Sequence, residues 1–331
     1  GNRATFSKLT YFEEGRPWWE WHQIALRRAE GLTLTYAFVA THNHFVLERG
    51  ANVFNRSAPI IKLSIGSSEQ QHLGILGLLN SSIGCFWMKQ LFHNKGSTVD
   101  QHGARQRTDA FEDFYEFTST GLKDFPLPAT DPSDIAATID RTANDLQNHL
   151  PLSLFVVESG EAANLPTRAT LDVAQLQVLH LRKLIVAAQE ELDWRCYRLY
   201  GLLPAGGDPS TYEHPAALEV ALGERAFEIV LARRMAAGIE TTTWFERHGS
   251  TPTTEIPARW PEDYRQVVQR RIDLIERDRN IGLIERPEYK RRWNTPSWDS
   301  LEQAALRDWL LFFQAEDGIR DLAVTGSTDS K

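Results

Sequence analysis

The pattern of apolar and polar positions divides the chain into two regions that meet near residue 130. In the first region, residues 32–39 (LTLTYAFV) alternate and are rich in β-forming side chains, which predicts a strand. Residues 44–47 and 59–65 are short apolar runs that predict two further strands. Short strands of this kind, mixed with helices, indicate a small α/β unit in residues 1–130.

Two helices come after these predicted strands. Ser67 and Ser68 are suited to cap the first helix. Its apolar face holds Leu73, Leu76, Leu79 and Ile83. The second helix is expected over residues 86–92 and is ended by Gly96. Residues 94–110 are polar and predict an exposed loop, and residues 125–128 (FPLP) predict an extended exit from the region.

The second region, residues 131–311, is predicted to be almost wholly helical. Residues 131–133 (DPS) form a helix start signal. A long amphipathic helix near 171–200 is indicated by apolar residues at spacings of three and four, namely Leu171, Ala174, Val178, Leu181, Ile185, Ala188, Leu192, Cys196 and Leu199. Further helices are expected at about 215–236, 261–280 and 298–311, with loops over 151–170 and 247–257. The predicted fold class is therefore α+β.

The charge is distributed unevenly along the chain. The net charge is −8. Residues 1–130 hold 13 basic and 12 acidic residues, whereas the remainder holds 23 basic and 32 acidic residues. Because binding to nucleic acid depends on the local field, the acidic total does not exclude DNA binding by the first region.

The remaining composition points to a cytoplasmic protein without a membrane partner. Cys85 and Cys196 lie far apart without C-x-x-C spacing, which argues against a structural zinc site and a disulfide framework. No run reaches the ~18 apolar residues of a spanning helix, and no signal-peptide pattern opens the chain. The chain starts at Gly1 rather than methionine, so we expect its natural start to lie upstream.

The last twenty residues, 312–331, are a separate case. Residues 312–321 (FFQAEDGIRD) resemble the translated sequencing-adapter peptide that contaminates metagenomic assemblies. We therefore expect the natural sequence to stop near Leu311 and the tail to be non-native and without function. The alternative is a genuine acidic C-terminal turn.

The sequence lacks the common motifs of an active site. It has no Walker phosphate loop, no G-x-S-x-G elbow and no H-E-x-x-H helix. It also lacks the N-P-P-[YF] or D-P-P-Y tetrapeptide with which an amino-methyltransferase holds the amine of a flipped base. No glycine-rich strand–turn–helix for a nucleoside cofactor is present. We expect neither a catalytic residue nor a cofactor in this chain.

The densest cluster of candidate ligands is Thr41-His42-Asn43-His44. His42 and His44 stand two apart on a strand, point to the same face and would suit a metal. Because no third ligand stands nearby in the sequence, we expect no metal. The alternative is that His42, Asn43 and His44 face DNA or their own backbone at the end of the strand.

Other donors suited to DNA stand on turns and loops of the first region. Arginine binds guanine and asparagine binds adenine bidentately, which makes Arg56 and Asn55 candidates, with Lys62 on the next strand. The polar loop carries further donors that reach phosphates, namely His93, Asn94, Lys95, Arg105 and Arg107. The alternative for both segments is an ordinary solvated turn or loop.

Two aromatic segments have a structural and a DNA-binding interpretation. Residues 16–22 (RPWWEWH) suit base stacking, but such clusters more often pack one domain against another. Residues 285–293 (ERPEYKRRW) suit the DNA backbone or a solvated face. The same ambiguity holds for Arg270, Arg271, Arg277 and Arg279.

These segments together resemble the PglX family, the adenine-specific DNA methyltransferases of type 2 phage-exclusion systems (BREX, or phage growth limitation). The resemblance is carried by residues 13–23 (EEGRPWWEWHQ), 38–47 (FVATHNHFVL), 53–63 (VFNRSAPIIKL), 189–194 (QEELDW), 197–202 (YRLYGL) and 279–293 (RNIGLIERPEYKRRW). Residues 76–82 (LGLLNSS) and 125–128 resemble the target-recognition domains of adenine methyltransferases more widely. The resemblance covers nearly all of residues 9–311.

The resemblance implies a parent enzyme that transfers a methyl group from S-adenosylmethionine to adenine N6 in a specific duplex site, marking host DNA. Residues 1–130 would form the target-recognition domain, and residues 131–311 the helical C-terminal region. The implied partners are double-stranded DNA, the missing N-terminal methyltransferase domain and other phage-defence proteins. The S-adenosylmethionine site would lie in that missing domain, outside this chain.

Two alternative functions stay open. The first is the equivalent part of a restriction–methylation fusion enzyme, which an upstream nuclease motif would reveal. The second is a protein-docking module of a defence complex, built on the acidic helical region. A metal-dependent hydrolase built on His42 and His44 is the weakest idea.

Overall fold

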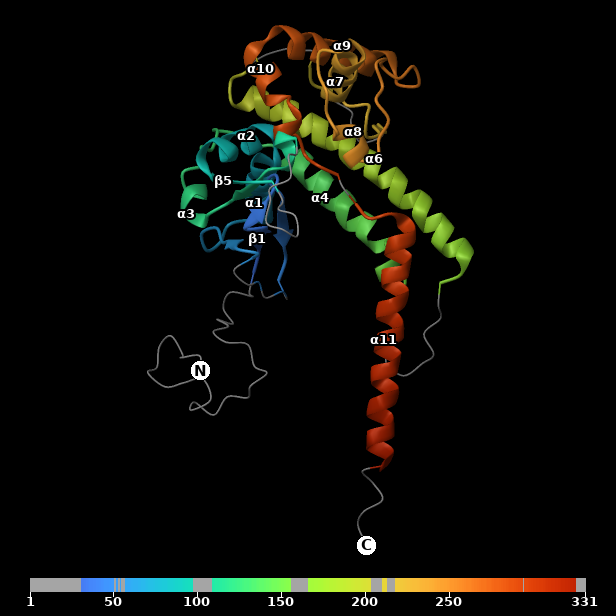
Figure 1. The fold of residues 1–331 in the computed structure, drawn as a ribbon. Coiled ribbons are helices and arrows are strands. Elements are labelled where there is room, and N and C mark those ends of the chain that lie inside the picture. The colour runs from blue at the N-terminus through green and yellow to red at the C-terminus, as the bar shows by residue number, and fades with distance from the viewer. Residues whose placement is uncertain are drawn as a thin grey trace.

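The computed structural model describes residues 31–50, 52, 54, 57–97, 109–155, 166–203, 210–212, 218–293 and 295–325, with the backbone alone for 312–325. Two small antiparallel sheets lie in the N-terminal part of the described chain, and helices make up most of its C-terminal part (Figure 1). This arrangement confirms the α+β class.

The first sheet has the strand order β3-β1-β4. Strand β1 (Thr33–Tyr36) pairs antiparallel with β3 (Phe45–Glu48) on one side and with β4 (Ile60–Ile61) on the other. The strand expected over 59–65 is therefore shorter than predicted, because only two of its residues pair with β1.

The second sheet has the strand order β2-β6-β5. Its central strand β6 (Phe114–Glu116) pairs antiparallel with β2 (Val39–Ala40) and with β5 (His93–Gly96). The strand expected over 32–39 breaks at Phe38, whose N–H donates to the Ser57 carbonyl and whose carbonyl accepts from Phe117. The chain passes there from the first sheet to the second.

The loop prediction over 94–110 was wrong at its start, since residues 93–96 form strand β5. The pairing partner of β5 lies about twenty residues further along the chain. The sequence pattern did not predict β5, because its side chains are polar. An edge strand forms its backbone hydrogen bonds whether or not its side chains make an apolar face.

Helices α1 (Glu69–Asn80) and α2 (Ser82–Leu91) cover the sheets. The predicted start of α1 is confirmed: the Ser68 hydroxyl accepts from Gln71 N–H (3.2 Å), and the Gln71 side chain accepts from Ser68 N–H (2.8 Å). Ser81 caps α2 in turn, accepting from Gly84 N–H. Two local capping arrangements therefore fix where both helices begin.

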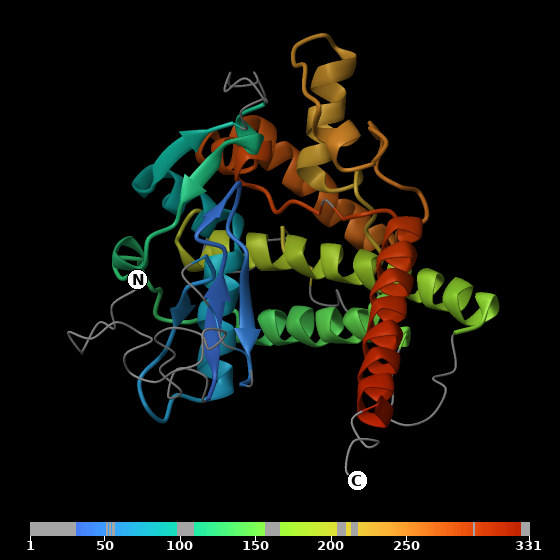
Figure 2. The same ribbon diagram turned by 60° about the horizontal axis from the view of Figure 1, so that its bottom comes forward.

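Helices α4 (Ser133–Asn148) and α6 (Arg168–Leu199) lie side by side in both views (Figures 1 and 2). The helix start predicted at residues 131–133 and the long helix predicted near 171–200 are both confirmed. The predicted apolar positions of α6 are buried except Leu199, which is half-buried. Within the stretch predicted as a loop, Pro151–Leu154 form the short helix α5.

The C-terminal helices pack above one face of α6. Helix α7 (Ala226–Ala236) is shorter than predicted, whereas α9 (Glu262–Arg277) matches its prediction closely. Short helices α8 (Trp244–Arg247) and α10 (Arg279–Ile284) complete this part. Their apolar side chains form a core with the α6 residues Val186, Ala187, Trp194 and Tyr197.

A second core lies under the sheets and also includes α6. Leu34 and Phe45 of the first sheet pack there with Ala136 of α4 and with Leu192 and Cys196 of α6. Helix α6 therefore contributes to both cores. The core under the sheets crosses the boundary expected near residue 130, because α4 and α6 supply part of it.

Four smaller or peripheral elements remain. They are α3 (Ser119–Leu122), the 3-10 helices η2 (Ala110–Glu112) and η4 (Pro287–Tyr289), and α11 (Trp298–Thr325), which runs away from the rest of the fold (Figure 1). The backbone of residues 312–321 continues α11. Within the described residues, no helix has the length and apolar character needed to cross a membrane.

Candidate nucleic-acid interface

Asn43 holds the loop that carries the two candidate histidines. Its side-chain amide donates to the Leu79 carbonyl (2.6 Å) and to the Ser81 carbonyl (3.0 Å), where α1 ends and α2 begins. Asn43 is only 3% exposed. Both amide hydrogens are thus used inside the protein, and Asn43 positions its neighbours instead of offering a donor at the surface.

Asn80, in the segment that resembles target-recognition domains, fixes the same loop from the other side. Its side-chain oxygen accepts from Phe45 N–H (2.9 Å), and its side-chain amide donates to the Phe45 carbonyl (2.9 Å). The Asn80 side chain therefore bonds both backbone polar groups of Phe45, as the backbone of a neighbouring strand would. The loop between β2 and β3 is therefore held at both Asn43 and Phe45, on either side of His44.

His42 and His44 lie together at the end of the β2–β3 loop. Their rings meet edge to face with centroids 6.2 Å apart. The Nδ1 atom of His44 faces the Nη2 atom of Arg291 at 3.2 Å. Because guanidinium only donates, Nδ1 of His44 accepts, and the ring is neutral with its proton on Nε2.

Burial and the nearby arginines keep both histidines neutral. The positive charge of Arg291, followed by burial, lowers the pKa of His44 to about 3. Burial, with Arg291 as the next cause, lowers the pKa of His42 well below its ordinary value. Burial also lowers the pKa of Arg291 to about 10. A guanidinium so poor in counter-charge favours an anionic ligand.

Arg292 joins the C-terminal segment to the N-terminal sheets. Its Nη1 donates to Thr41 Oγ1 (3.3 Å) and its Nε to His248 Nε2 (3.4 Å), while Nη2 lies 3.9 Å from a Glu112 carboxylate oxygen. Burial is the main reason that the pKa of Arg292 is lowered. The basic segment recognised in the sequence is therefore brought against the β2–β3 loop, more than two hundred residues away.

These residues form one end of a pocket of about 610 Å³, which we call the Arg291 groove. Its lining comes from the β2–β3 loop, β3, α1, β6, α4, α6 and residues 291–293 and 295. Arg291 and Arg292 contact the β2–β3 loop at His44 and Thr41, and we call this part of the lining the basic end. Leu76, Ile139 and Ile185 supply apolar lining, which we call the apolar floor. Pockets of this size and character are the usual binding sites of proteins.

Strand β5 offers a second group of donors. His93, Asn94 and Lys95 are all exposed on this edge strand. Lys95 forms an ion pair with Glu116, and Asn94 donates to Asp113 (3.0 Å). Lys95 lies at an irregularity in the register, and the next residue, Gly96, pairs with Phe114 of β6, which also lines the Arg291 groove. The two groups of predicted donors thus share one end of the second sheet.

Of the other predicted DNA-binding residues, the structure describes only Lys62. Lys62 is exposed and comes directly after β4. Asn55, Arg56, Arg105 and Arg107 lie outside the described residues, as do the tryptophans of residues 16–22. Among the described neighbours, Ser97 comes directly after β5, and Asp109 directly precedes η2.

A metal site is not supported in the part of the chain that the structure describes. No group of three or more His, Cys, Asp or Glu side chains there could hold an ion. His42 and His44 form a pair without a third ligand of these types. Arginines surround the two rings, and cations of this kind disfavour a metal ion.

A buried ionic network, which the sequence patterns did not predict, holds the two regions together. Lys290 is 1% exposed, and its Nζ donates to Asp193 (2.8 Å) and to Glu285 (2.8 Å). Asp193 also accepts from the backbone N–H (2.8 Å) and hydroxyl (2.6 Å) of Ser82. Ser82, Asp193, Glu285 and Lys290 lie in the segments 76–82, 189–194 and 279–293, on which the family resemblance depends. That resemblance was the one signal of the network in the sequence.

A second buried ion pair fixes α9 against α6. Arg271, for which the sequence left a DNA-backbone contact and a solvated face open, is 1% exposed and donates to Glu191 (2.6 Å) and to the Ser210 carbonyl (2.7 Å). Its guanidinium also lies 5.2 Å from the centre of the Trp194 ring. Arg271 is therefore a structural residue, whereas Arg270 and Arg277 are exposed.

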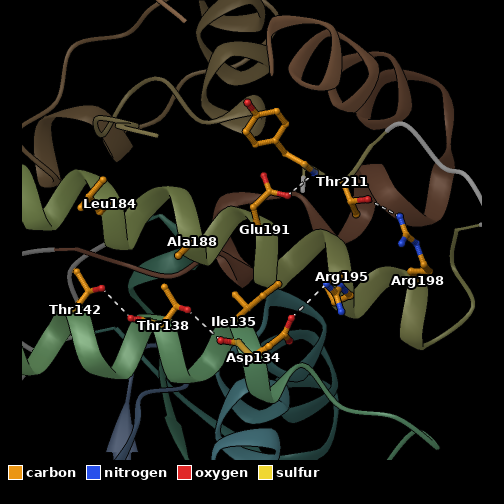
Figure 3. Close-up of a pocket in the computed structure, with 11 residues that line it drawn as sticks. Asp134, Ile135, Thr138, Thr142, Leu184, Ala188, Glu191, Arg195, Arg198 and Thr211 are labelled. Atoms are coloured by element: carbon orange, nitrogen blue, oxygen red, sulfur yellow. Dashed lines mark hydrogen bonds and ion pairs between the residues drawn. The ribbon is translucent and has the colours of Figure 1, made fainter. Parts of the chain in front are cut away.

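A further pocket, of about 510 Å³, lies between α4 and α6 on another face (Figure 3). Thr138 and Thr142 of α4 donate their hydroxyls to carbonyls of their own helix. Arg195 faces Asp134 at 3.6 Å across the pocket. These polar groups are already partnered within the protein, so this pocket is a weaker candidate than the Arg291 groove.

The comparisons with known proteins agree with the resemblance. The chain is 49% identical over 317 residues, 94% of its length, to the adenine-specific methyltransferase PglX of Streptomyces coelicolor. It spans 26% of that relative, in a C-terminal portion. A family model described as a domain of unknown function, DUF7008, matches residues 185–318, which include Lys290 and Arg291. No solved structure matches the chain.

Proposed function

We propose that this chain is the DNA-recognition and C-terminal portion of a site-specific adenine-N6 DNA methyltransferase that marks host DNA in phage defence. The proposal rests above all on the 49% identity over nearly the whole chain to a protein named an adenine-specific methyltransferase. The parent enzyme would act in the cytoplasm on double-stranded DNA.

The chemistry of the surface supports the proposal. Arg291 and Arg292 lie at one end of the second sheet, and Lys95 lies near this end on the edge strand β5. Arginine and lysine neutralise phosphates, and contacts of that kind supply most of the affinity for duplex DNA. These cations are concentrated at one place in a chain whose net charge is −8.

The methyl donor would bind elsewhere in the parent protein. Nucleoside cofactors bind at the carboxyl ends of parallel strands, and both sheets described here are antiparallel. The residues described do not fit S-adenosylmethionine, and the sequence lacks the tetrapeptide that holds the target amine. This chain would instead grip the duplex, which offsets the few kcal/mol that base flipping costs.

The test is duplex binding by the full chain at about 50 mM and about 200 mM salt, with Arg56→Ala and Lys95→Ala. We expect binding to weaken steeply with salt and each variant to reduce the salt slope by about one, as a lost phosphate contact does. Arg307→Ala is the matched control, because this exposed arginine stands on α11, away from the sheets. Folded protein that does not bind at low salt contradicts the proposal.

A protein-docking module is the second candidate function, and one observation favours it. Val173, Leu176 and Leu179 are exposed on α6 by 67%, 68% and 47%, at spacings that place them along one stripe. Exposed apolar stripes mark protein interfaces. A partner captured equally well before and after nuclease treatment would support docking, whereas loss of the partner with nuclease would support DNA binding. The restriction–methylation fusion would require a nuclease motif upstream.

A further inference from the structure

We propose that the Arg291 groove binds a nucleotide, with the phosphate at the basic end and the base along the apolar floor. The inference deepens the proposed function, on which it rests for the source of the nucleotide, a DNA strand. The ligand chemistry is a phosphate ester attached to a flat ring, and a free nucleotide offers the same groups. The experiment below separates the two sources.

The charges of the groove favour an anion. Three arginines line it, namely Arg182, Arg291 and Arg292. The carboxylate among the lining residues, Asp140, is already paired with Arg49 at 2.6 Å, outside the groove lining. Arg291 forms no ion pair within the described residues. The local field is therefore positive, and a phosphate would supply the missing counter-charge.

Three residues of the groove lining carry buried nitrogen atoms that have no hydrogen-bond partner among the described residues. Nε2 of His42, Nε of Arg291 and Nε1 of Trp293 are buried without a hydrogen-bond partner in the described structure. All three residues line the groove. A buried donor without a partner is costly, so such groups in a native protein usually mark a missing ligand or water. A phosphate offers several acceptor oxygens to a donor set of this kind.

The apolar part of the groove suits a base. Leu76 of α1, Ile139 of α4 and Ile185 of α6 form its floor, and Trp293 stands near the basic end. The Arg291 guanidinium lies 5.2 Å from the centre of the Trp293 ring. Aromatic rings and guanidinium planes are the common stacking platforms for bases in proteins that bind single strands. A volume of about 610 Å³ is sufficient for one nucleotide.

Both walls of the groove are held in place before any ligand arrives. Asn43, within the β2–β3 loop, and Asn80, at the end of α1, fix the loop that carries the two histidines. In the C-terminal segment, Lys290 is anchored by Asp193 and Glu285, and Arg291 is its direct neighbour in the chain. A rigid site loses little conformational entropy on binding, which favours a specific ligand over a general electrostatic surface.

The experiment titrates the full chain with deoxyadenosine monophosphate, deoxyadenosine and inorganic phosphate by calorimetry. We expect the nucleotide to bind, with affinity at least about tenfold above that of either part alone, because charge and apolar contacts add. Arg291→Gln and, on α6, Arg182→Gln should each weaken nucleotide binding about tenfold or more. Arg307→Gln removes the same charge from exposed α11 and should change nothing.

A third variant tests the apolar end. Ala143 lines the groove from α4 and is exposed, so Ala143→Trp fills the floor without disturbing the core. It should abolish nucleotide binding and leave the thermal midpoint close to that of the native chain. If Arg291→Gln fails to fold, Arg182→Gln and Ala143→Trp carry the test, and unchanged nucleotide affinity in both overturns the inference.

A duplex and a single-stranded oligonucleotide complete the comparison. Weaker oligonucleotide binding in Arg182→Gln and Ala143→Trp supports a nucleotide of a DNA strand as the occupant. Binding of the mononucleotide without binding of either oligonucleotide supports a free nucleotide as the occupant. This outcome contradicts the proposed function and leaves the inference standing. Oligonucleotide binding that no groove variant alters, with no mononucleotide binding, overturns the inference and leaves the proposed function standing.

Discussion

At the residue scale, buried charges determine how the C-terminal segment is attached to α6. Lys290 is surrounded by Asp193, Glu285 and, at 3.5 Å, Glu190. The three carboxylates raise the pKa of Lys290, although burial alone would lower it. Tyr197 donates its hydroxyl to Glu285 in the same cluster. The network places Arg291 and Arg292, and with them the basic end of the groove.

Replacing Lys290 should therefore be severe. Lys290→Met leaves two hydrogen-bonded carboxylates buried without their cation, and we expect a loss of about 3–5 kcal/mol in the free energy of unfolding. Lys95→Met removes an exposed ion pair and should change it by less than about 1 kcal/mol. Urea unfolding measures both. Equal effects of the two substitutions would contradict the assignment of Lys290 as the anchor.

Glu190 gives the network a dependence on pH. Burial raises the pKa of Glu190 to about 7 in the folded state, against the positive charge of Lys290, which lowers it. The folded protein therefore binds a proton that the unfolded chain releases near pH 4.5, and this group's contribution to stability declines as pH rises through about 7. We expect Glu190→Gln to gain stability relative to the native chain between about pH 5 and about pH 8. A difference in urea midpoint that stays constant over this range would refute the prediction.

At the element scale, short local signals set the ends of helices, and long-range pairing sets the strands. Ser68 and Ser81 cap α1 and α2 through bonds within a few residues, so the helix start at Ser68 was readable in sequence. Strand β5 was not, because its partner β6 lies across the segment 98–108. Gly77 shows a further tertiary constraint: a Cβ there would lie 3.0 Å from that of Ala136, where α1 meets α4.

The cap of α1 can be tested by itself. Ser68→Ala removes the oxygen that accepts from Gln71 N–H, and we expect a loss of about 1 kcal/mol in the free energy of unfolding. Ser68→Asp keeps an acceptor at the same place and should retain most of the stability. Thermal or urea unfolding of the two variants measures the difference. Equal stability of the alanine and aspartate variants would show that the cap contributes nothing.

At the scale of the whole molecule, α6 unites the described residues into one folding unit. It supplies Leu192 and Cys196 to the core under the sheets, and Trp194 and Tyr197 to the core of the C-terminal helices. Arg292 and the pair of Ser82 with Asp193 bridge the same two regions. The division near residue 130 stays a prediction, and the shared helix argues for strong coupling across it.

This coupling predicts a single unfolding transition. Far-ultraviolet circular dichroism follows the helices, and fluorescence is the sum over ten tryptophans, which include Trp87 beside the core under the sheets and Trp194, Trp244 and Trp260 in the C-terminal core. Because neither core is complete without α6, we expect both signals to change at the same urea concentration. Two separated midpoints would show that the regions unfold independently and that the boundary near residue 130 is a true domain boundary.

The sequence by itself determined the α+β class, the long helix α6, the start of α1 and the resemblance to adenine methyltransferases. The fold class, the long helix and the start of α1 follow from periodicity or from motifs a few residues long. The resemblance follows from segments spread along the chain. Tertiary structure alone decided the roles of Asn43, Arg271 and Lys290, because the same polar residue is a surface donor or a buried anchor according to what surrounds it. It also decided the Arg291 groove, whose walls come from segments that are some two hundred residues apart and meet only through the packing of α6.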